Sequence, residues 1–491
     1  MASSAAEAFA HPAVAAGIAA LKAALTAASA RILDLEGALT TALARVAELE
    51  ARHDAPPKTP DNSSLPPSSG FKADRAARRR AARAEGEPAR KRGPKPGHRG
   101  VSRSRVDRAA VDQVVVCRPQ QCGSCGTTLP ETGGKIVGRQ QVVELPPVTP
   151  LVLELRRLRV RCRHCGHGTV GTAPDGWDRQ ASFGPRIVTL AALLHEQQHV
   201  AYARLVTLFA EVFGLQLSEG ALVAAVARLG AKLAPDAETI ARDVRAAPVV
   251  GSDETSMRVD GKLWWAWVFQ TATAAVFRIE PRRNAAVVLA FLAGKQPGTW
   301  VSDLFSAQRK APSERYQVCL QHQLRDLLYA EQCEQGPERQ AERAWAVQFA
   351  ALIRRAIHSR NQYADDACTA PDFVAALAMI EAECDALLGQ RLRVGQSYSL
   401  QTRFLVHRTG LWTFLHDPAV PPTNNSSEQA LRPLVLHRKV TNGFRAQGAA
   451  ARYADLRTVA ETARRRGQSV FATLLEAAGT PLPLTPRHQL A

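Results

Sequence analysis

Residues 249–255, Val-Val-Gly-Ser-Asp-Glu-Thr, predict a short apolar strand that leads to an acid, Asp253. Residues 263–271 and 274–279 predict two more strands, since both are rich in Trp, Val or Phe. The dipeptide Asp260-Gly261 predicts a turn between the first strand and the second. The acid therefore lies on the first of three consecutive strands.

A second acid follows a fourth predicted strand. Residues 284–293 have helical character, and residues 299–302 predict a strand that leads directly to Asp303. Three strands, a helix and a fourth strand ending in Asp is the layout of a ribonuclease-H-like core. In that core the first and fourth strands are neighbours, so we expect Asp253 and Asp303 to lie close together.

Length and composition bound the class of protein. The chain has 491 residues, enough for roughly two to four domains, and 46% of them are apolar. No run of about 18 uncharged apolar residues is evident, so no membrane span is expected. The net charge of +18 indicates a polyanionic partner. Four of the nine cysteines form Cys-x-x-Cys pairs, which suits metal binding in a reducing cytoplasm better than disulfides.

A heptad pattern predicts a helix over residues 14–53. Its apolar residues are spaced by alternating steps of three and four: Ile18, Leu21, Leu25, Ala28, Ile32, Leu35, Leu39, Ala42, Val46 and Leu49. This is the period of a coiled-coil seam, so we expect the helix to join copies of the chain into a homo-oligomer. Alternatively, the apolar face of this helix would pack against other parts of the same chain.

Residues 54–110 are expected to form a disordered linker and a basic arm. The linker is dense in Pro, Ser and Asn, a composition that does not support a packed core. Residues 72–108 hold fourteen Lys or Arg and four Asp or Glu, a net +10. The densest clusters contain Arg78, Arg79, Arg80, Arg90, Lys91 and Arg92. Such a run neutralises phosphates, so contact with double-stranded DNA is favoured over a solvated tail.

Two Cys-x-x-Cys pairs predict a zinc ribbon over residues 111–175. The pairs are Cys122 with Cys125 and Cys162 with Cys165, separated by 36 residues. Alternating residues between the pairs predict a β-hairpin over 142–145 and 151–160. We expect four thiolates to hold one structural zinc ion, with no open position for chemistry.

Residues 176–245 are expected to form a helical domain. A helix over 205–213, a break at Gly214 and a second helix capped by Ser218 fit a helix-turn-helix. Two simply packed helices fit as well. Few basic residues lie near the start of the second helix, which weakens a DNA-reading role.

The catalytic core is expected over residues 246–445, with a C-terminal helical region over 446–491. Residues 324–416 are mostly helical and too long for a loop of this core, so they predict an all-helical insertion. After two prolines, Asn or Ser caps a helix whose first turn carries Glu428. The fold class is thus a multidomain α+β protein.

The order of these features resembles the IS66 family of bacterial insertion-sequence transposases. The motifs are KTPDNSSLPPSSG at 58–70, KRGPKPGHRG at 91–100, the paired CxxC, DET at 253–255, Cys319-x-x-His322, and NNSSEQALRPLVLHRK at 424–439. The resemblance implies a DDE-type transposase whose catalytic triad is Asp253, Asp303 and Glu428. It also allows accessory proteins from the same element. The chain departs from the family after Asp303, where Leu-Phe-Ser-Ala-Gln replaces a Gly-Tyr-type continuation.

Three carboxylates suit DNA phosphodiester chemistry. The reaction needs a hydroxyl made nucleophilic and a leaving oxygen stabilised, and two magnesium (or manganese) ions about 4 Å apart do both. We expect Asp253 to bridge the ions, with Asp303 and Glu428 each completing one shell. Water would free a 3′-hydroxyl at the transposon end, and that hydroxyl would then attack target DNA.

Other residues have expected roles around this triad. Arg438 and Lys439, ten and eleven residues beyond Glu428 on the same predicted helix, would hold flanking phosphates. His322 would support a metal ligand, carry a proton or be structural. Four of the five cysteines outside the pairs are expected to be small apolar packing residues: Cys319, Cys333, Cys368 and Cys384.

Two other functions compete with transposition. A zinc-containing DNA-binding protein, or an inactivated transposase relative, would carry the acids without using them. A structure-selective nuclease of the ribonuclease-H type would cleave DNA but never join it.

Overall fold

A computed structural model describes residues 12–53, 56–59, 62, 98, 100, 103–174, 177 and 182–479. The basic clusters lie outside the described residues, and with them Arg78, Arg79, Arg80, Arg90, Lys91 and Arg92.

The predicted heptad helix is present as α2 (Pro12–His53). The side chains of its apolar seam, where the structure describes them, are exposed, for example Leu21 at 72% and Leu25 at 70%. The stretch Ala15–Leu43 is also long and apolar enough, at a mean hydropathy of 1.4, to cross a membrane. This differs from the expectation of no span, because Lys22 is the one charge in the run from Val14 to Ala30.

Residues 103–174 contain only short regular elements: η2 (Arg108–Ala110), β1 (Arg159–Arg161) and β2 (Gly168–Val170). The prediction of a hairpin over 142–145 and 151–160 was wrong, because only residues 159–161 of those stretches form a strand. Instead β1 pairs antiparallel with β2 on the far side of the second Cys-x-x-Cys pair. The strands that pair are therefore the two short segments on either side of the tight Cys162–Cys165 turn, and not the long alternating stretches before it.

Residues 182–245 form three helices, and the second and third are the two helices predicted from the sequence. The helices are α4 (Pro185–Glu196), α5 (Tyr202–Phe213) and α6 (Glu219–Arg245). Gly214 ends α5 in the left-handed region at φ 66°, and the Ser218 hydroxyl caps α6 by accepting a bond from the Ala221 N–H at 3.2 Å. α6 buries Leu222, Val226 and Leu229 in the core, so its apolar face is used for packing.

A mixed five-stranded sheet forms the centre of the chain, and the predicted strands are confirmed. The strands are β3 (Val249–Val259), β4 (Lys262–Gln270), β5 (Ala275–Glu280), β6 (Thr299–Ser302) and β7 (Arg315–Val318). Their order is β5-β4-β3-β6-β7. β3 is antiparallel to β4 and parallel to β6, so the first and fourth strands are neighbours as expected. The turn at Asp260 and Gly261 has φ of 50° and 69°, the conformation that joins tight hairpins.

Different helices cover the two faces of the sheet. α6 and α7 (Ala285–Leu292) pack with Trp267, Phe269 and Trp300 on one face. α13 (Asn425–Thr441) and α14 (Gln447–Arg465) pack on the other face, where Met257 and Phe277 are buried. α14 contacts β5 and α6, so the C-terminal helices belong to the same core as the sheet, and α15 (Val470–Ala478) packs on α4.

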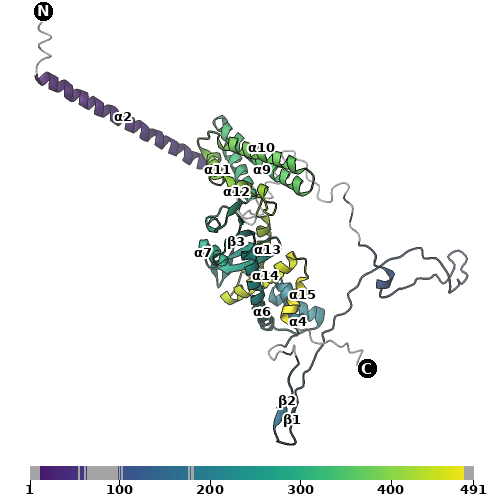
Figure 1. Ribbon diagram of the computed structural model, residues 1–491. Coiled ribbons are helices and arrows are strands. Elements are labelled where there is room, and N and C mark those ends of the chain that lie inside the picture. Colours follow the sequence, from purple (N-terminus) through teal and green to yellow (C-terminus); the bar gives the residue numbers. More distant parts are fainter. Residues whose placement is uncertain are drawn as a thin grey trace, which may run out of the picture.

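The helices predicted within residues 324–416 are also present. They follow β7 and have their own apolar cluster, centred on Trp345, Phe349 and Phe404. The elements are α8 (Leu320–Cys333), η4 (Pro337–Arg339), α9 (Gln340–Ala364), α10 (Ala370–Leu388), α11 (Gly395–Val406) and α12 (Arg408–His416). Figure 1 shows α9, α10 and α11 gathered at one end of the sheet, away from α4, α6 and α15.

Candidate functional site

Asp253 and Asp303 lie on the same face of the sheet. Gly251 of β3 is paired with Val301 of β6 in the parallel ladder. Side chains alternate along a strand, so the residues two positions further on project to the same face as this pair, which is the face covered by α13. The register agrees with the expected strand order. Asp253, Asp303 and Glu428 do not have ligand atoms within 4.8 Å of one another, however; among the described residues only Cys319, His322 and Glu428 meet that spacing.

A hydrogen-bonded network holds the start of α13, and hence Glu428, against β3. The Asn424 side-chain amide donates to the Ser252 carbonyl at 2.7 Å, and the Ser427 hydroxyl donates to Asn424 Oδ1 at 2.6 Å. Gln270 of β4 donates to the Ser427 hydroxyl at 2.7 Å. A Cβ at Gly251 would lie 3.2 Å from the Ser427 hydroxyl, so the absence of a side chain there lets α13 approach the strand.

The three acids interact electrostatically. Burial raises the pKa of Asp253 well above its ordinary value, and the negative charges of Glu254, Asp303 and Glu428 raise it further. One hydrogen bond, from the Glu254 N–H to Asp253 Oδ1 at 2.8 Å, opposes that rise. A concentration of negative charge with so little compensation favours the binding of cations.

Glu254 is neutralised by the protein itself. Its side chain is 2% exposed and forms an ion pair with Arg283 at 2.8 Å. Gln308 donates to its other carboxylate oxygen at 2.7 Å. The Arg283 guanidinium also stacks over the rings of Trp265 and Phe305. Glu254 thus faces away from Asp253, and its carboxylate is occupied by Arg283 and Gln308.

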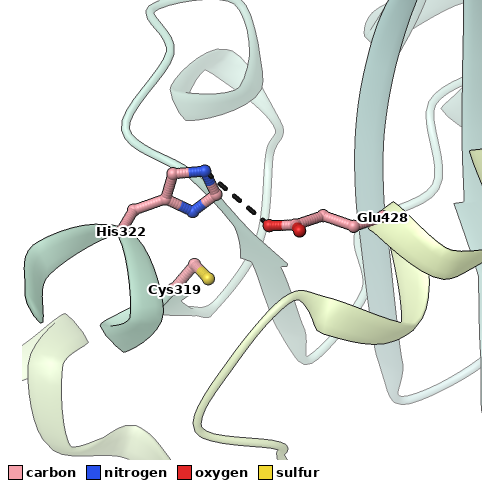
Figure 2. Close-up of side chains that lie close together, drawn as sticks. All are labelled: Cys319, His322 and Glu428. Carbon is pink, nitrogen blue, oxygen red and sulfur yellow. Dashed lines mark ion pairs between the residues drawn. The ribbon is translucent and has the colours of Figure 1, made fainter. Parts of the chain in front are cut away.

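Glu428 has close neighbours of a different chemical kind. The sulfur of Cys319, a ring nitrogen of His322 and a carboxylate oxygen of Glu428 all lie within 4.8 Å of one another. Figure 2 shows the three side chains directed toward one space, with the dashed line joining His322 Nε2 to Glu428 Oε1 at 3.8 Å. The Cys319 N–H donates to the Ser302 carbonyl at 2.9 Å, which fixes this group beside the end of β6. The prediction of Cys319 as a mere packing residue was therefore incomplete.

A basic hollow lies at the opposite end of β3. Its lining residues are Arg258, Gly261, Arg438, Lys439, Asn442, Phe444 and Arg445. The Arg438 guanidinium donates to both the carbonyl and the hydroxyl of Ser256, so it anchors α13 to β3 as well as bordering the hollow. A Cβ at Gly443, where φ is 97°, would lie 2.3 Å from the Arg258 carbonyl, so the loop below the hollow requires glycine.

The two cysteine pairs fold into matching turns. In each, the N–H of the following glycine donates to the carbonyl of the first cysteine at 2.9 Å, and that glycine has φ of 74°. A short antiparallel pairing flanks each turn, Gln121 with Thr128 in one and β1 with β2 in the other. Hydrogen bonds from Thr127 lower the pKa of Cys125 to about 7, which favours the metal-binding thiolate.

The structure does not bring the two turns together around one ion. Within the described ranges, the only group of three or more ligand atoms inside 4.8 Å is the one at Cys319, His322 and Glu428. All four paired cysteines are free thiols: Cys122, Cys125, Cys162 and Cys165. Each half of the predicted site is therefore formed, and the complete four-thiolate site is not.

Comparison with known families gives two matches. A family model described as the transposase IS66 family matches residues 180–452, more than half of the chain. A second model, described as the zinc-finger binding domain of transposase IS66, matches residues 119–166. No curated protein matches the chain. The first match includes all three acids with Cys319 and His322, and the second includes both cysteine pairs.

Proposed function

The chain belongs to the IS66 family of transposases, and on that premise we propose that it cleaves and joins DNA at the ends of a bacterial insertion sequence. The proposal assigns Asp253, Asp303 and Glu428 as the ligands of catalytic divalent cations, on a ribonuclease-H-like core. The observation that carries it is the adjacency of the three segments that bear these acids: β3 pairs with β6, and hydrogen bonds hold α13 against β3. These residues are up to 175 positions apart along the chain.

The residues present fit magnesium or manganese ions. The donors are carboxylates, which hard divalent cations prefer. Glu428 Oε1 is buried and has no hydrogen-bond partner. When bound, the cations would activate the attacking hydroxyl and stabilise the leaving oxygen. Asp253 is assigned as the shared ligand, since β3 is next to β6, which leads to Asp303, and is contacted by α13, which carries Glu428.

The surrounding residues would hold the acids in position. Asn424 ties the start of α13 to the Ser252 carbonyl, next to Asp253 in the chain. The N–H of Phe305 donates to Asp303 Oδ1 at 3.0 Å and orients that carboxylate. Arg283 keeps Glu254 occupied, so it does not compete for cations. His322, 3.8 Å from Glu428, is assigned to orient that acid or carry a proton.

DNA contact is assigned to two regions. The basic arm of residues 72–108 would bind phosphates without reading sequence. In the core, Lys439 is exposed at the basic hollow together with Arg258 and Arg445. Asp253 and Arg258 are five residues apart on one strand, or roughly 17 Å. That separation corresponds to about five base pairs of B-form DNA, so the hollow would hold a phosphate flanking the cleavage point.

The remaining regions complete the proposed organisation. The cysteine pairs at residues 111–175 would hold a structural zinc ion, which the zinc-finger match supports. The exposed apolar seam of α2 would pair with α2 of a second copy of the chain. The helices of residues 324–416 form an insertion in the core. The enzyme would act in the cytoplasm, on the bacterial nucleoid.

A strand-transfer assay tests the catalytic assignment. DNA carrying the inverted repeats that flank the coding region is incubated with magnesium and either wild type, Asp253→Asn or a control, Asp260→Asn. Asp260 is an exposed acid at the other end of β3, in a left-handed conformation that Asn tolerates. We expect the Asp253 variant to lose joined products by more than about 10³-fold, with DNA binding retained, and the control to resemble wild type.

Other outcomes separate the competing functions. Cleaved but never joined products would indicate a nuclease. DNA binding without any cleavage, in wild type as in the variant, would indicate a non-catalytic DNA-binding protein.

A further inference from the structure

The group formed by Cys319, His322 and Glu428 has the composition and geometry of a transition-metal site. Thiolate, imidazole and carboxylate are all zinc ligands, whereas magnesium prefers oxygen alone. Zinc bonds of about 2.0–2.3 Å place tetrahedral ligand atoms roughly 3.3–3.8 Å apart. His322 Nε2 and Glu428 Oε1 already lie 3.8 Å apart, and no pair of ligand atoms in the group exceeds 4.8 Å. Small side-chain rotations would complete a three-ligand site.

The helix geometry explains why these side chains meet. Cys319 is the N-cap of α8 and His322 lies in its first turn, so a spacing of three residues puts both on one side of the helix. Glu428 approaches from the first turn of α13, and Figure 2 shows it facing the His322 ring across the space above the Cys319 sulfur. Glu428 Oε1 is buried without a hydrogen-bond partner, which leaves it available to a cation.

The environment of the Cys319 sulfur resembles that of a metal-binding cysteine pair in the same chain. At Cys162, the N–H groups two and three residues further along bond to the sulfur and lower its pKa. At Cys319, burial raises the pKa to about 11, but the N–H groups two and three residues further along oppose that rise. The N–H of Asn424 also donates to the Cys319 sulfur at 3.1 Å. These N–H groups would stabilise a thiolate once a cation displaces its proton to solvent.

We propose that Cys319, His322 and Glu428 bind a thiophilic divalent cation, with zinc as the best-fitting ion, at a site separate from the cysteine pairs. Three protein ligands leave a fourth position open to water. The binding of zinc here uses Glu428, and this acid is also a proposed magnesium ligand. Zinc and magnesium therefore compete for Glu428, and zinc binding inhibits DNA joining. The competition rests on the proposed function, whereas zinc binding itself does not.

Metal stoichiometry tests the site directly. The full chain is stripped of metal and titrated with cobalt(II), which reports thiolate ligation by its charge-transfer absorption, and then with zinc. Wild type is expected to bind one more ion per chain than Cys319→Ser. The variant His322→Asn should show the same loss. Cys384→Ser is the matched control, since Cys384 is also fully buried but belongs to the insertion core; it should bind as many ions as wild type.

Two results would overturn the proposal. The site does not exist if Cys319→Ser and His322→Asn both bind as many ions as wild type. Should Cys319→Ser fail to fold by circular dichroism, His322→Asn decides alone, because the His322 side chain is partly exposed. The competition is wrong if zinc inhibits magnesium-dependent joining equally in wild type and Cys319→Ser; we expect the variant to need at least about tenfold more zinc. Failure of wild type to join DNA at all would instead contradict the proposed function and leave the stoichiometry result intact.

Discussion

The acid site and the cysteine pairs are assembled in opposite ways. Asp253, Asp303 and Glu428 come from three distant segments, and strand pairing between β3 and β6 and hydrogen bonds between β3 and α13 hold those segments side by side. The cysteine pairs are each formed within a few residues, by one turn and one short pairing. Nothing in the described residues 103–174 brings the two turns within ligand distance of each other.

The difference shows where the free energy of each site comes from. The acid site is preorganised by apolar packing of the sheet, at the expense of placing like charges close together. In residues 103–174 every residue is exposed or only partly exposed, so packing contributes little there. A metal ion would have to supply the energy that joins the two turns. Removal of zinc should therefore unfold residues 103–174 and leave residues 182–479 folded.

Zinc removal is expected to give the largest effect. Structural zinc sites contribute an apparent binding free energy of roughly 10–16 kcal/mol, which is folding free energy when the site is not preformed. With a strong chelator, we expect protease cleavage to become rapid within residues 103–174, while residues 182–479 stay protected. Limited proteolysis followed by mass spectrometry measures both regions in one experiment.

Two cysteine variants sharpen this prediction. Cys122→Ser should lose zinc and reproduce the effect of the chelator, whereas Cys117→Ser, an exposed cysteine outside the pairs, should not. Equal protease sensitivity of residues 103–174 with and without zinc would mean that the metal does not organise them.

The next largest effect should come from the ion pair behind the acid site. In Arg283→Ala, Glu254 keeps its buried carboxylate but loses its cationic partner. Breaking a buried pair typically costs about 3–5 kcal/mol; because the Arg283 side chain is 40% exposed, we expect about 2–3 kcal/mol in the free energy of unfolding. Urea denaturation measures it. Arg282→Ala, one residue earlier and exposed, should stay within about 0.5 kcal/mol of wild type.

Asp253→Asn should stabilise the metal-free protein while it removes activity. The folded pKa of Asp253 is raised above its ordinary value of 3.8, first by burial and then by the neighbouring acids. The folded state therefore binds this proton more tightly than the unfolded state, and stability falls as pH rises from about 3.8 to the folded pKa. Asn carries no charge to bury, so at pH 7 we expect the variant to be more stable than wild type by about 1 kcal/mol or more.

Thermal denaturation with and without magnesium completes this measurement. Magnesium should raise the melting temperature of wild type and have a smaller effect on the variant, because only the wild-type acid binds it. A variant less stable than wild type at pH 7 without metal would show that Asp253 is not destabilised by its neighbours.

The smallest effect is expected at the basic hollow. Lys439→Ala should weaken DNA binding by about 1 kcal/mol or less and reduce the salt dependence, the slope of log K against log salt concentration, by about 0.9. Lys295→Ala, an exposed lysine between α7 and β6, serves as the control. Titrations at several salt concentrations measure the slope, and an unchanged slope in Lys439→Ala would remove this residue from the DNA interface.

The elements of the sheet were predictable because their signals are local. The Trp-, Val- and Phe-rich run of residues 263–271, the Asp260-Gly261 turn and the cap before residue 285 each depend on a few neighbouring side chains. The match to the transposase family confirms the recognition made from motif order. The hairpin predicted between the cysteine pairs failed because alternation alone does not form a strand without a partner that covers it.

The supports of the acid site were not predictable in the same way. Arg283 and Gln308 reach Glu254 from 29 and 54 residues away, and no sequence spacing indicates those contacts. Asn424 belongs to a visible motif, but its bond to Ser252 across 172 residues depends on how α13 packs. Cys319 differs from these residues because Cys-x-x-His is a metal-ligand spacing that can be recognised in the sequence. Its proximity to Glu428, in contrast, depends on the tertiary structure.

Iron-directed cleavage of the polypeptide tests most directly whether three distant acids share one cation site. Iron(II) replaces magnesium in the full chain carrying Cys319→Ser, and peroxide then generates radicals that cut the backbone near the ion. We predict cuts around residues 253, 303 and 428 together, all of them lost when Asp253→Asn is added. Cuts around residues 253 and 303 without one near 428 would contradict the shared site.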